Sequence, residues 1–393
     1  MTPRETSSAG SGRGAYEAAL GLAWMSDSGC HSLLRLLARE GSEEIWKASP
    51  RRLSEWGLTP RAVGRYLEKR DCFVLQEALE AMATAGLGFV PFGSRLYPRE
   101  LTQLVHPPAG LFFRGEAEVL ERLTERPRVT IVGTRRATAY GLRVTGAFAS
   151  AFAGQGVAVV SGMALGIDTQ AHKAALETDG LTVAVLGCGA DVVYPRRHRS
   201  VYERIAKGGI VLSELPPGSG PTRWTFPHRN RLLAALGDAV LVVEASCTSG
   251  ALQTVDHALE LGRPVFSVPG SIYADGHKGC NVLLYQGAFP ALDPCVTVED
   301  FLSLTRMERL GRQPVWLPRL KGGGARDSVG GPSETQDPRL AGILESLVSA
   351  PRSAETLMVE RGLTAREVMA ALGELESSGM VMRSGPGLYI RAP

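Results

Sequence analysis

Between residues 88 and 304, short apolar runs rich in β-branched residues alternate with amphipathic stretches of ten or more residues. The short runs predict strands and the amphipathic stretches predict helices. The predicted strands are 128–134, 157–161, 182–187, 210–214, 239–244 and 264–269, and the predicted helices are 138–154, 166–179, 198–207, 228–236 and 249–261. Helical crossovers join parallel strands, so we expect an α/β fold with a mostly parallel sheet and helices on both faces. Residues 88–115 are expected to add edge strands.

Four polar segments that contain glycine follow predicted strands: Val132–Arg135, Ser161–Asp168, Gly187–Asp191 and Val242–Gly250. The carboxyl ends of parallel strands meet at one edge of a sheet, so these loops are expected to converge there. A fifth segment, Phe226–Arg231, places an aromatic ring and two arginines around one asparagine. This combination predicts a site for anions and a stacked base.

The bulk composition is that of a globular protein with more than one domain. The chain has 393 residues, of which 44% are hydrophobic and 21% are charged. Residues 1–14 are polar and lack the apolar stretch of a signal peptide, and no apolar run reaches the roughly 18 residues of a membrane-spanning helix. We therefore expect a cytoplasmic protein without membrane insertion. The six cysteines are dispersed, which predicts reduced, mostly buried thiols and no structural metal.

Basic residues are concentrated in one part of the chain. Segment 195–231 contains eight basic side chains against Glu203 and Glu214, although the whole chain has a formal charge of only +3. Six of the 43 basic residues are lysines and the others are arginines, which suit bidentate contacts to phosphate. A GC-rich genome would explain the arginine bias but not its clustering. The segment predicts an anionic partner.

Two common nucleotide-binding motifs are missing. No G-x-G-x-x-G follows the first strand of the predicted sheet, which argues against a nicotinamide enzyme. The P-loop pattern G-x-x-x-x-G-K-[ST] is absent, and the chain contains no Gly-Lys dipeptide. The first glycine loop, Gly133-Thr134-Arg135, could still bind a phosphate through its backbone N–H groups and the arginine.

Three acidic residues near these loops have alternative roles. Asp168 and His172 could form an acid–base pair, but their i, i+4 spacing favours a structural role within a helix. Asp191 could bond the backbone of its own tight turn. Glu244 follows a predicted strand, and we expect it to orient Arg229 or Arg231 rather than to act in catalysis.

The segments on either side of the sheet have different patterns. Residues 1–14 are predicted to be a disordered tail, and residues 15–87 a set of short packed helices. Residues 305–337 are rich in Gly, Pro, Arg and Ser, which predicts a flexible linker. Residues 338–393 offer three helical patterns and then a hairpin, the order of a winged helix. The third helix there has one arginine against three glutamates, so we expect this module to bind protein or regulate a dimer rather than bind duplex DNA.

Ordered motifs between residues 97 and 270 resemble the DNA-processing protein A family, also called Smf. They are Tyr97-Pro98, Val132–Arg135, Ser161–Asp168, Ala171-His172, Tyr194-Pro195, Ser213-Glu214, Phe226–Arg231, Val243–Ala245, Ser249-Gly250, Gly262-Arg263 and Val268–Gly270. The resemblance implies a sterile-alpha-motif-like domain over 15–87, an extended Rossmann domain over 88–304 and a winged helix. It also implies a homodimer that acts in natural transformation (competence), binds and protects incoming single-stranded DNA, loads RecA recombinase and accommodates or displaces single-strand binding protein.

Carried over residue by residue, the resemblance implies a DNA-binding site without catalytic residues, cofactor or metal. Its members are Gly133, Thr134, Arg135, Ser161, Gly162, Arg223, Phe226, Arg229, Asn230, Arg231, Ser249 and Gly250. Phe226 would stack a base and the arginines would contact phosphates. The chain departs from the family pattern at Ala251, where a hydroxyl residue is usual, so one possible phosphate contact is absent.

The alternative is an enzyme. The same type of Rossmann domain resembles that of nucleoside-monophosphate phosphoribohydrolases, which contain a Pro-Gly-Gly-x-Gly-Thr-x-x-Glu motif. That motif, with its catalytic carboxylate, is absent from this chain. A non-enzymatic DNA-binding protein is therefore the favoured interpretation.

Overall fold

The computed structural model of the chain describes residues 11–25, 31–309, 338–347, 352–378, 380–385 and 388–391. The chain divides into two compact units, 1–315 and 316–393. Residues 1–10 of the predicted tail and 310–337 of the predicted linker lie outside the described residues. A helix already begins at Ser11, inside the predicted tail, and another continues to Arg309, inside the predicted linker.

A nine-stranded sheet forms the centre of the first unit, in the order β1-β2-β6-β5-β4-β3-β7-β8-β9. β1 and β2 pair antiparallel with each other, β2 pairs antiparallel with β6, and all other neighbours are parallel. The α/β prediction is confirmed. The strands are β1 (Gly88–Pro91), β2 (Gly110–Gly115), β3 (Arg128–Val132), β4 (Ala158–Ser161), β5 (Thr182–Val185), β6 (Ile210–Ser213), β7 (Ala239–Val242), β8 (Val265–Ser267) and β9 (Phe289–Pro290).

The strand order reverses beside β3. From β3 to β6 the strands follow one another in one direction across the sheet, and β7 then returns to the other side of β3, where Val129 faces Ala239. In open α/β sheets, ligands bind outside the carboxyl ends of the strands at such a switch point. The topology therefore selects the loops after β3 and β7 as the first place to look for a site.

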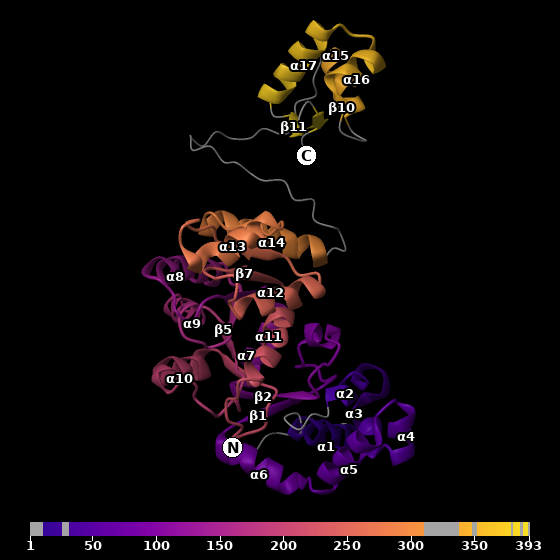
Figure 1. Cartoon of the computed structure of the whole chain (residues 1–393), viewed down its shortest axis with the longest axis vertical. Helices are drawn as coiled ribbons and strands as arrows, with labels where there is room; N and C mark the ends of the chain where they lie inside the picture. The colour runs from indigo at the N-terminus through magenta and orange to yellow at the C-terminus, as the bar shows by residue number, and fades with distance from the viewer. Residues whose placement is uncertain are drawn as a thin grey trace. The chain divides into compact units, whose positions relative to one another are not determined.

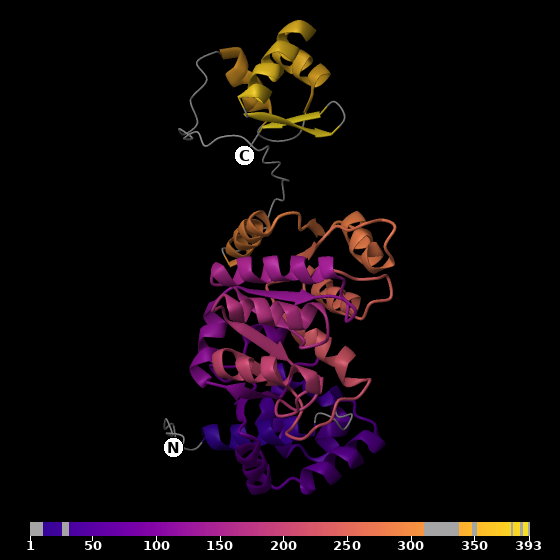
Figure 2. The same cartoon turned by 90° about the vertical axis from the view of Figure 1, so that its left-hand side faces the viewer.

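Helices cover both faces of this sheet, as predicted (Figure 1). Alternate strand residues turn to opposite faces: Ile131 and Val159 meet one layer of helices, whereas Val160 and Val240 meet the other. The first layer has α8 (Ala139–Gly154), α9 (Ile167–Glu177), α10 (Arg199–Gly208) and α14 (Pro294–Arg309), and the second has α7 (Ala117–Glu125), α11 (Thr225–Leu236), α12 (Ala251–Glu260) and α13 (Asp275–Tyr285). Figure 2 shows α8, α9 and α10 one below another on the first face.

The amino-terminal helices share a core with the sheet. They are α1 (Ser11–Trp24), α2 (His31–Leu34), α3 (Leu37–Lys47), α4 (Pro50–Glu55), α5 (Pro60–Asp71) and α6 (Leu75–Ala85). The ring of Tyr16 lies 5.6 Å from that of Phe89 on β1, and the ring of Trp24 lies 6.0 Å from that of Phe112 on β2. The helices therefore belong to the same compact unit as the sheet.

The second unit has the element order of a winged helix. It contains α15 (Pro338–Ser346), β10 (Arg352–Ser353), α16 (Ala354–Arg361), α17 (Ala365–Ser377), β11 (Val381–Gly385) and β12 (Leu388–Arg391). The strands form an antiparallel sheet in the order β10-β12-β11. Thr364 and Glu367 cap α17 reciprocally, each side chain accepting from the other residue's backbone N–H. The predicted order of helices and hairpin is confirmed.

The cysteines are less buried than predicted. Cys188 and Cys280 are buried, but Cys72, Cys247 and Cys295 are exposed, and all five are free thiols. Among the described residues, no group of three or more His, Cys, Asp or Glu side chains could hold a metal ion. In the same part of the chain, none of the helices combines the length and the apolar character needed to cross a membrane.

Candidate nucleic-acid interface

A cavity of about 750 Å³ opens at the switch point of the sheet. Its walls come from the loops after β3, β4, β5, β6 and β7 and from the starts of α11 and α12. The four glycine-containing loops thus converge at one edge of the sheet, as expected. Nine of the predicted site residues line the cavity: Gly133, Thr134, Arg135, Arg223, Phe226, Arg229, Asn230, Ser249 and Gly250.

Two glycines permit this close approach of the loops. A Cβ at Gly133 would lie 2.6 Å from Cγ1 of Ile167 and 2.9 Å from the carbonyl oxygen of Glu244. Gly166 has a φ of +77°, and a Cβ there would lie 2.4 Å from the carbonyl oxygen of Thr134. Any larger residue at either position would force the loops apart.

Phe226 lies in the first turn of α11 and not in the loop before it. α11 begins at Thr225, three residues earlier than predicted. In a helix, residues i, i+3 and i+4 share a face, so Phe226, Arg229 and Asn230 all point toward the cavity. Arg231 is five positions from Phe226 and lies on another face. Because of this helical geometry, the residues of the Phe226–Arg231 segment do not all face the cavity.

Phe226 contacts two other side chains at the cavity. The Arg135 guanidinium carbon lies 5.2 Å from the centre of the half-buried Phe226 ring, within the range of a cation–π contact. The ring of Tyr194 lies 5.6 Å from the same ring, tilted by 42°. Arg135 is exposed. A positively charged surface that includes aromatic rings therefore forms at the mouth of the cavity.

Arg229 lies beneath this surface and has protein partners. Its side chain is 4% exposed, and its Nη1 donates to the carbonyl oxygen of Gly162 at 2.8 Å and to that of Val185. Burial lowers the pKa of Arg229 to about 10, so the guanidinium stays charged at neutral pH. Arg229 was expected to contact phosphate directly. Instead it bonds the backbone after β4 and β5 and places positive charge under the cavity floor.

Arg231 also departs from its predicted role. Its guanidinium forms an ion pair with Glu214 and donates to the carbonyl oxygen of His106 at 2.9 Å. Arg231 is 8% exposed and does not line the cavity. Glu244 was expected to orient one of these arginines, and that prediction is wrong: its carboxylate accepts from N and Oγ1 of Thr138, at 3.0 and 3.1 Å. Glu244 thereby holds the amino-terminal end of α8 against β7.

Ser161 and Gly162 are buried below the cavity, although both were expected to contact DNA. The Ser161 hydroxyl donates to the carbonyl oxygen of Ile131 at 2.6 Å. The Gly162 N–H donates to Oδ2 of Asp168 at 3.1 Å, and a Cβ at Gly162 would lie 2.5 Å from the Arg229 guanidinium. Their contacts support the floor of the cavity and do not reach its interior.

Asp168 and His172 have separate structural partners, as the spacing favoured. Asp168 accepts from the N–H groups of Gly162 and Ala164, and burial raises its pKa. His172 Nδ1 bonds Oγ1 of Thr182 at 2.7 Å, and burial lowers its pKa to about 3. A neutral, fully buried imidazole is not arranged to exchange protons with a ligand. Asp191 was expected to bond the backbone of its own turn, but its carboxylate instead accepts from the Gly218 N–H in the loop after β6.

The structure adds cationic and aromatic groups that the sequence interpretation missed. Arg136 lines the cavity and is exposed. Trp224 is 70% exposed, and the Arg223 guanidinium carbon lies 4.6 Å from the centre of its ring. The doublets Arg135-Arg136 and Arg223-Trp224 were visible in the sequence. Neither doublet belongs to a sequence pattern that would distinguish a site residue from an ordinary surface residue.

The far wall of the cavity is the start of α12. Asn230 Nδ2 donates to the carbonyl oxygen of Gly250 at 3.3 Å, and Ser249 Oγ accepts from the Ala251 N–H at 3.3 Å. These bonds connect α11 to the loop after β7. The start of a helix is the positive end of its dipole and favours anions, so this wall adds to the positive charge of the arginines.

Residues 88–303 match the family model described as DNA recombination-mediator protein A, and residues 330–387 match the DprA winged helix domain. The chain belongs to the DNA recombination-mediator protein A family. The match spans the whole sheet that builds the cavity, and the second match confirms the class of the carboxy-terminal unit.

Similar full-length sequences and similar solved structures agree with this assignment. Protein Smf of Synechocystis is 34% identical over 95% of this chain and 98% of its own length, and Protein Smf of Escherichia coli is 34% identical over 86% of each. The structure of DNA processing protein A from Streptococcus pneumoniae matches 74% of this chain and 97% of its own, with a TM-score of 0.63 at 29% identity. That from Helicobacter pylori, described for its single-stranded DNA binding mode, matches 56% and 98%, with a TM-score of 0.51 at 30% identity.

Proposed function

We propose that this protein is a non-enzymatic mediator of recombination that binds single-stranded DNA in the cavity at the switch point of its sheet. The observation that supports this most directly is the cluster of Arg135, Phe226 and Tyr194 at the cavity mouth. Single-strand sites combine aromatic rings, on which bases stack, with positive charge along the backbone path. The solved relative from Helicobacter pylori is described for single-stranded DNA binding.

The geometry suggests how a strand occupies the site. Arg135 covers one face of the Phe226 ring, so an incoming base stacks either on the outer face of that guanidinium or on Phe226 after the arginine turns aside. The exposed guanidiniums of Arg136 and Arg223 are then available for neighbouring phosphates. Arg229 contributes charge from below while keeping its bonds to the two carbonyl groups. Among the twelve predicted residues, we retain as DNA contacts those that line the cavity, with the exception of the buried Arg229.

The family description supports a proposed cellular role. A recombination mediator must place a recombinase on single strands, so we propose that the protein protects incoming DNA during natural transformation and loads RecA, with single-strand binding protein displaced or accommodated. The corresponding assay measures RecA filament formation on DNA coated with single-strand binding protein. Filament formation that is no faster with the protein than without it would refute the loading role.

A homodimer is the proposed working form. The parts of the chain near α12 and α13 carry several exposed large apolar side chains: Leu259, Ile272, Tyr273, Val282, Tyr285 and Leu292. Tyr273 and Tyr285 are 92% and 93% exposed. A contiguous exposed apolar patch marks an interaction surface in a soluble protein, and these side chains are the candidates for one in this chain. A second copy of the chain is the proposed occupant.

A nucleotide-processing enzyme is the alternative function. The carboxylates closest to the cavity are engaged: Asp168 accepts two backbone N–H groups, and Glu244 is 1% exposed and bonded to Thr138. Incubation with nucleoside monophosphates is expected to release no free base, and release would support the enzyme.

The binding function is tested by titrating labelled oligothymidylate with the full-length protein at several salt concentrations. We expect tight binding. The logarithm of the association constant should fall linearly with the logarithm of the salt concentration, with a slope of about 0.7 per phosphate contact. Wild-type protein that binds no single strand even at low salt would overturn the proposal.

A further inference from the structure

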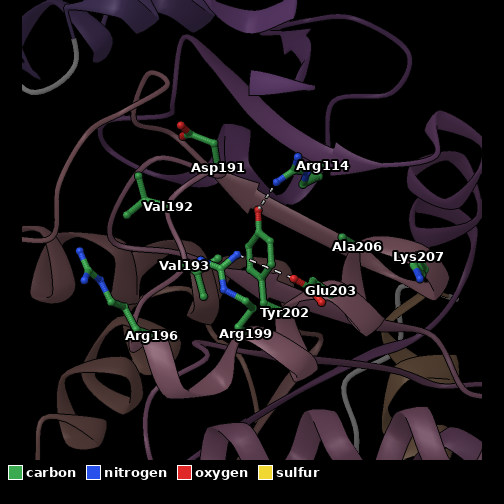
Figure 3. Close-up of a pocket in the computed structure, with 10 residues that line it drawn as sticks. All are labelled: Arg114, Asp191, Val192, Val193, Arg196, Arg199, Tyr202, Glu203, Ala206 and Lys207. Atoms are coloured by element: carbon green, nitrogen blue, oxygen red, sulfur yellow. Dashed lines mark hydrogen bonds and ion pairs between the residues drawn. The ribbon is translucent and has the colours of Figure 1, made fainter. Parts of the chain in front are cut away.

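A second cavity, of about 510 Å³, lies beside α10, and the DNA site described above does not use it. Four basic side chains line it, Arg114 on β2 and Arg196, Arg199 and Lys207 at or near α10, against the two carboxylates of Asp191 and Glu203. Figure 3 shows Arg196 and Lys207 at opposite ends of this cavity, with Arg199 between them. Its charge predicts an anionic ligand that extends along the helix.

The two cavities share one loop. Tyr194, whose ring lies beside that of Phe226, lines the first cavity, whereas Val192, Val193 and Arg196 of the same loop line the second. A strand that passes over Tyr194 therefore meets Arg196 two residues further along the loop. This continuity favours the backbone of the same single strand over a separate small anion.

The second cavity offers phosphate contacts and no base-stacking ring. Tyr202 forms its floor, but its side chain is 2% exposed and its hydroxyl accepts from Nη1 of Arg114 at 3.2 Å, as the dashed line in Figure 3 marks. The guanidinium of Arg114 is thus held in place by a buried partner. Val192, Val193 and Ala206 complete an apolar floor. Such a surface suits a sugar–phosphate backbone whose bases face the solvent.

The acidic residues do not cancel this charge. The Asp191 carboxylate accepts from the Gly218 N–H at 3.0 Å, and Figure 3 shows it turned away from the centre of the cavity. Glu203 lies 3.8 Å from Nη1 of Arg199, and both side chains are more than half exposed, at 56% and 66%. Exposed pairs of this kind contribute little stability, so Arg199 can exchange Glu203 for a phosphate. Among the described acidic side chains, none is within ion-pair distance of Arg196.

We propose that the cavity formed by Arg114, Arg196, Arg199 and Lys207 is a second backbone-binding station for the single strand that leaves the Phe226 site. The proposal rests on the proposed function. In this proposal, basic residues of α10 bind the phosphates that follow the stacked base. It also gives a role to the cluster of basic residues in segment 195–207, none of which lines the first cavity. A strand long enough to span both cavities reaches phosphate-binding groups that a short strand does not reach.

The test compares two oligothymidylates, of roughly six and roughly twenty nucleotides, with the full-length protein. In the charge-reversal variant Arg196→Glu/Arg199→Glu, we expect short-strand affinity to stay at the wild-type value. Long-strand affinity should fall, and its salt slope should decrease by about 0.7 for each phosphate that the variant no longer binds. Glu203→Gln, which removes the competing carboxylate, should tighten only long-strand binding.

Arg204→Glu is the matched control, because Arg204 is an exposed arginine of the same helix that does not line the cavity. An equal loss of affinity in this control, or long-strand binding unchanged in the double variant, would overturn the second station while leaving the first site intact. Wild-type protein that binds neither length would overturn both proposals. The inference is supported if the higher affinity for the long strand than for the short one disappears only in the cavity variant. Thermal unfolding of each variant checks that it is folded.

Discussion

The Arg135 guanidinium lies 5.2 Å from the centre of the Phe226 ring, so the charged group and the stacking ring of the candidate site form one unit. The two residues are 91 positions apart in sequence, on the loop after β3 and at the start of α11. The sheet topology brings them together at its switch point. Because their contributions to binding differ in kind, substitution of each should have a distinguishable effect.

Phe226→Ala should weaken binding of oligothymidylate by about 1 to 3 kcal/mol, because a stacked base loses its ring, and should leave the salt slope unchanged. Arg135→Ala should cost a similar amount and also reduce the slope by about 0.7. Fluorescence anisotropy titrations across salt measure both quantities. Arg143→Ala, an exposed arginine of α8 that does not line the cavity, is the control. Wild-type affinity in both site variants would exclude this cavity as the base site.

Arg229 is expected to act on stability rather than on direct phosphate contact. Arg229→Met should lower the free energy of unfolding by about 3 to 5 kcal/mol, because it leaves two buried carbonyl groups and the Asp168 carboxylate without their cation. Arg223→Met, at an exposed position, should leave stability near the wild-type value. Urea denaturation measures the difference. Equal stability of the two variants would return Arg229 to the set of phosphate-binding residues.

The fold was more predictable from sequence than the roles of the arginines. All six strands of the predicted parallel sheet were placed within two residues of their observed bounds, because short apolar runs between helices leave few alternatives. Arg229 and Arg231 could not be sorted in the same way. Which face of α11 each one occupies depends on where the helix begins. The start at Thr225 could not be predicted, because the segment before it is rich in Pro and Gly. The partners of Arg231, Glu214 and His106, come from distant parts of the chain.

Stability should fall with acid because of His172. Burial lowers its pKa in the folded protein to about 3, whereas the unfolded chain titrates near 6.5. Between these values the unfolded state binds the extra proton, so the free energy of unfolding should decrease as pH falls from about 6.5, by up to about 1.4 kcal/mol per pH unit. His172→Gln should flatten this dependence. His257→Gln, at a partly exposed position, should keep it. Denaturant melts at several pH values give the slopes, and an unchanged slope in His172→Gln would contradict the assignment.

Dimerisation should depend on the apolar side chains near α13. Tyr273→Glu/Tyr285→Glu should shift the protein toward the monomer, because two charges would be buried at the proposed contact. Val105→Glu, at a 76% exposed apolar residue elsewhere in the first unit, should leave the dimer intact. Light scattering coupled to size exclusion reports the mass of each. A double variant that remains dimeric would place the interface on another surface.

The carboxy-terminal unit should contribute little to DNA affinity. α17 contains one arginine and three glutamates, whereas a helix that enters the major groove is normally basic. A chain ending at residue 309 retains the sheet and the whole cavity, so its affinity for single strands should match that of the full-length protein. Binding of duplex DNA should also be unchanged, and any effect should appear in dimer mass or in binding of protein partners. If the truncation removed duplex binding while single-strand affinity and partner binding stayed intact, the unit would instead be a duplex-binding module.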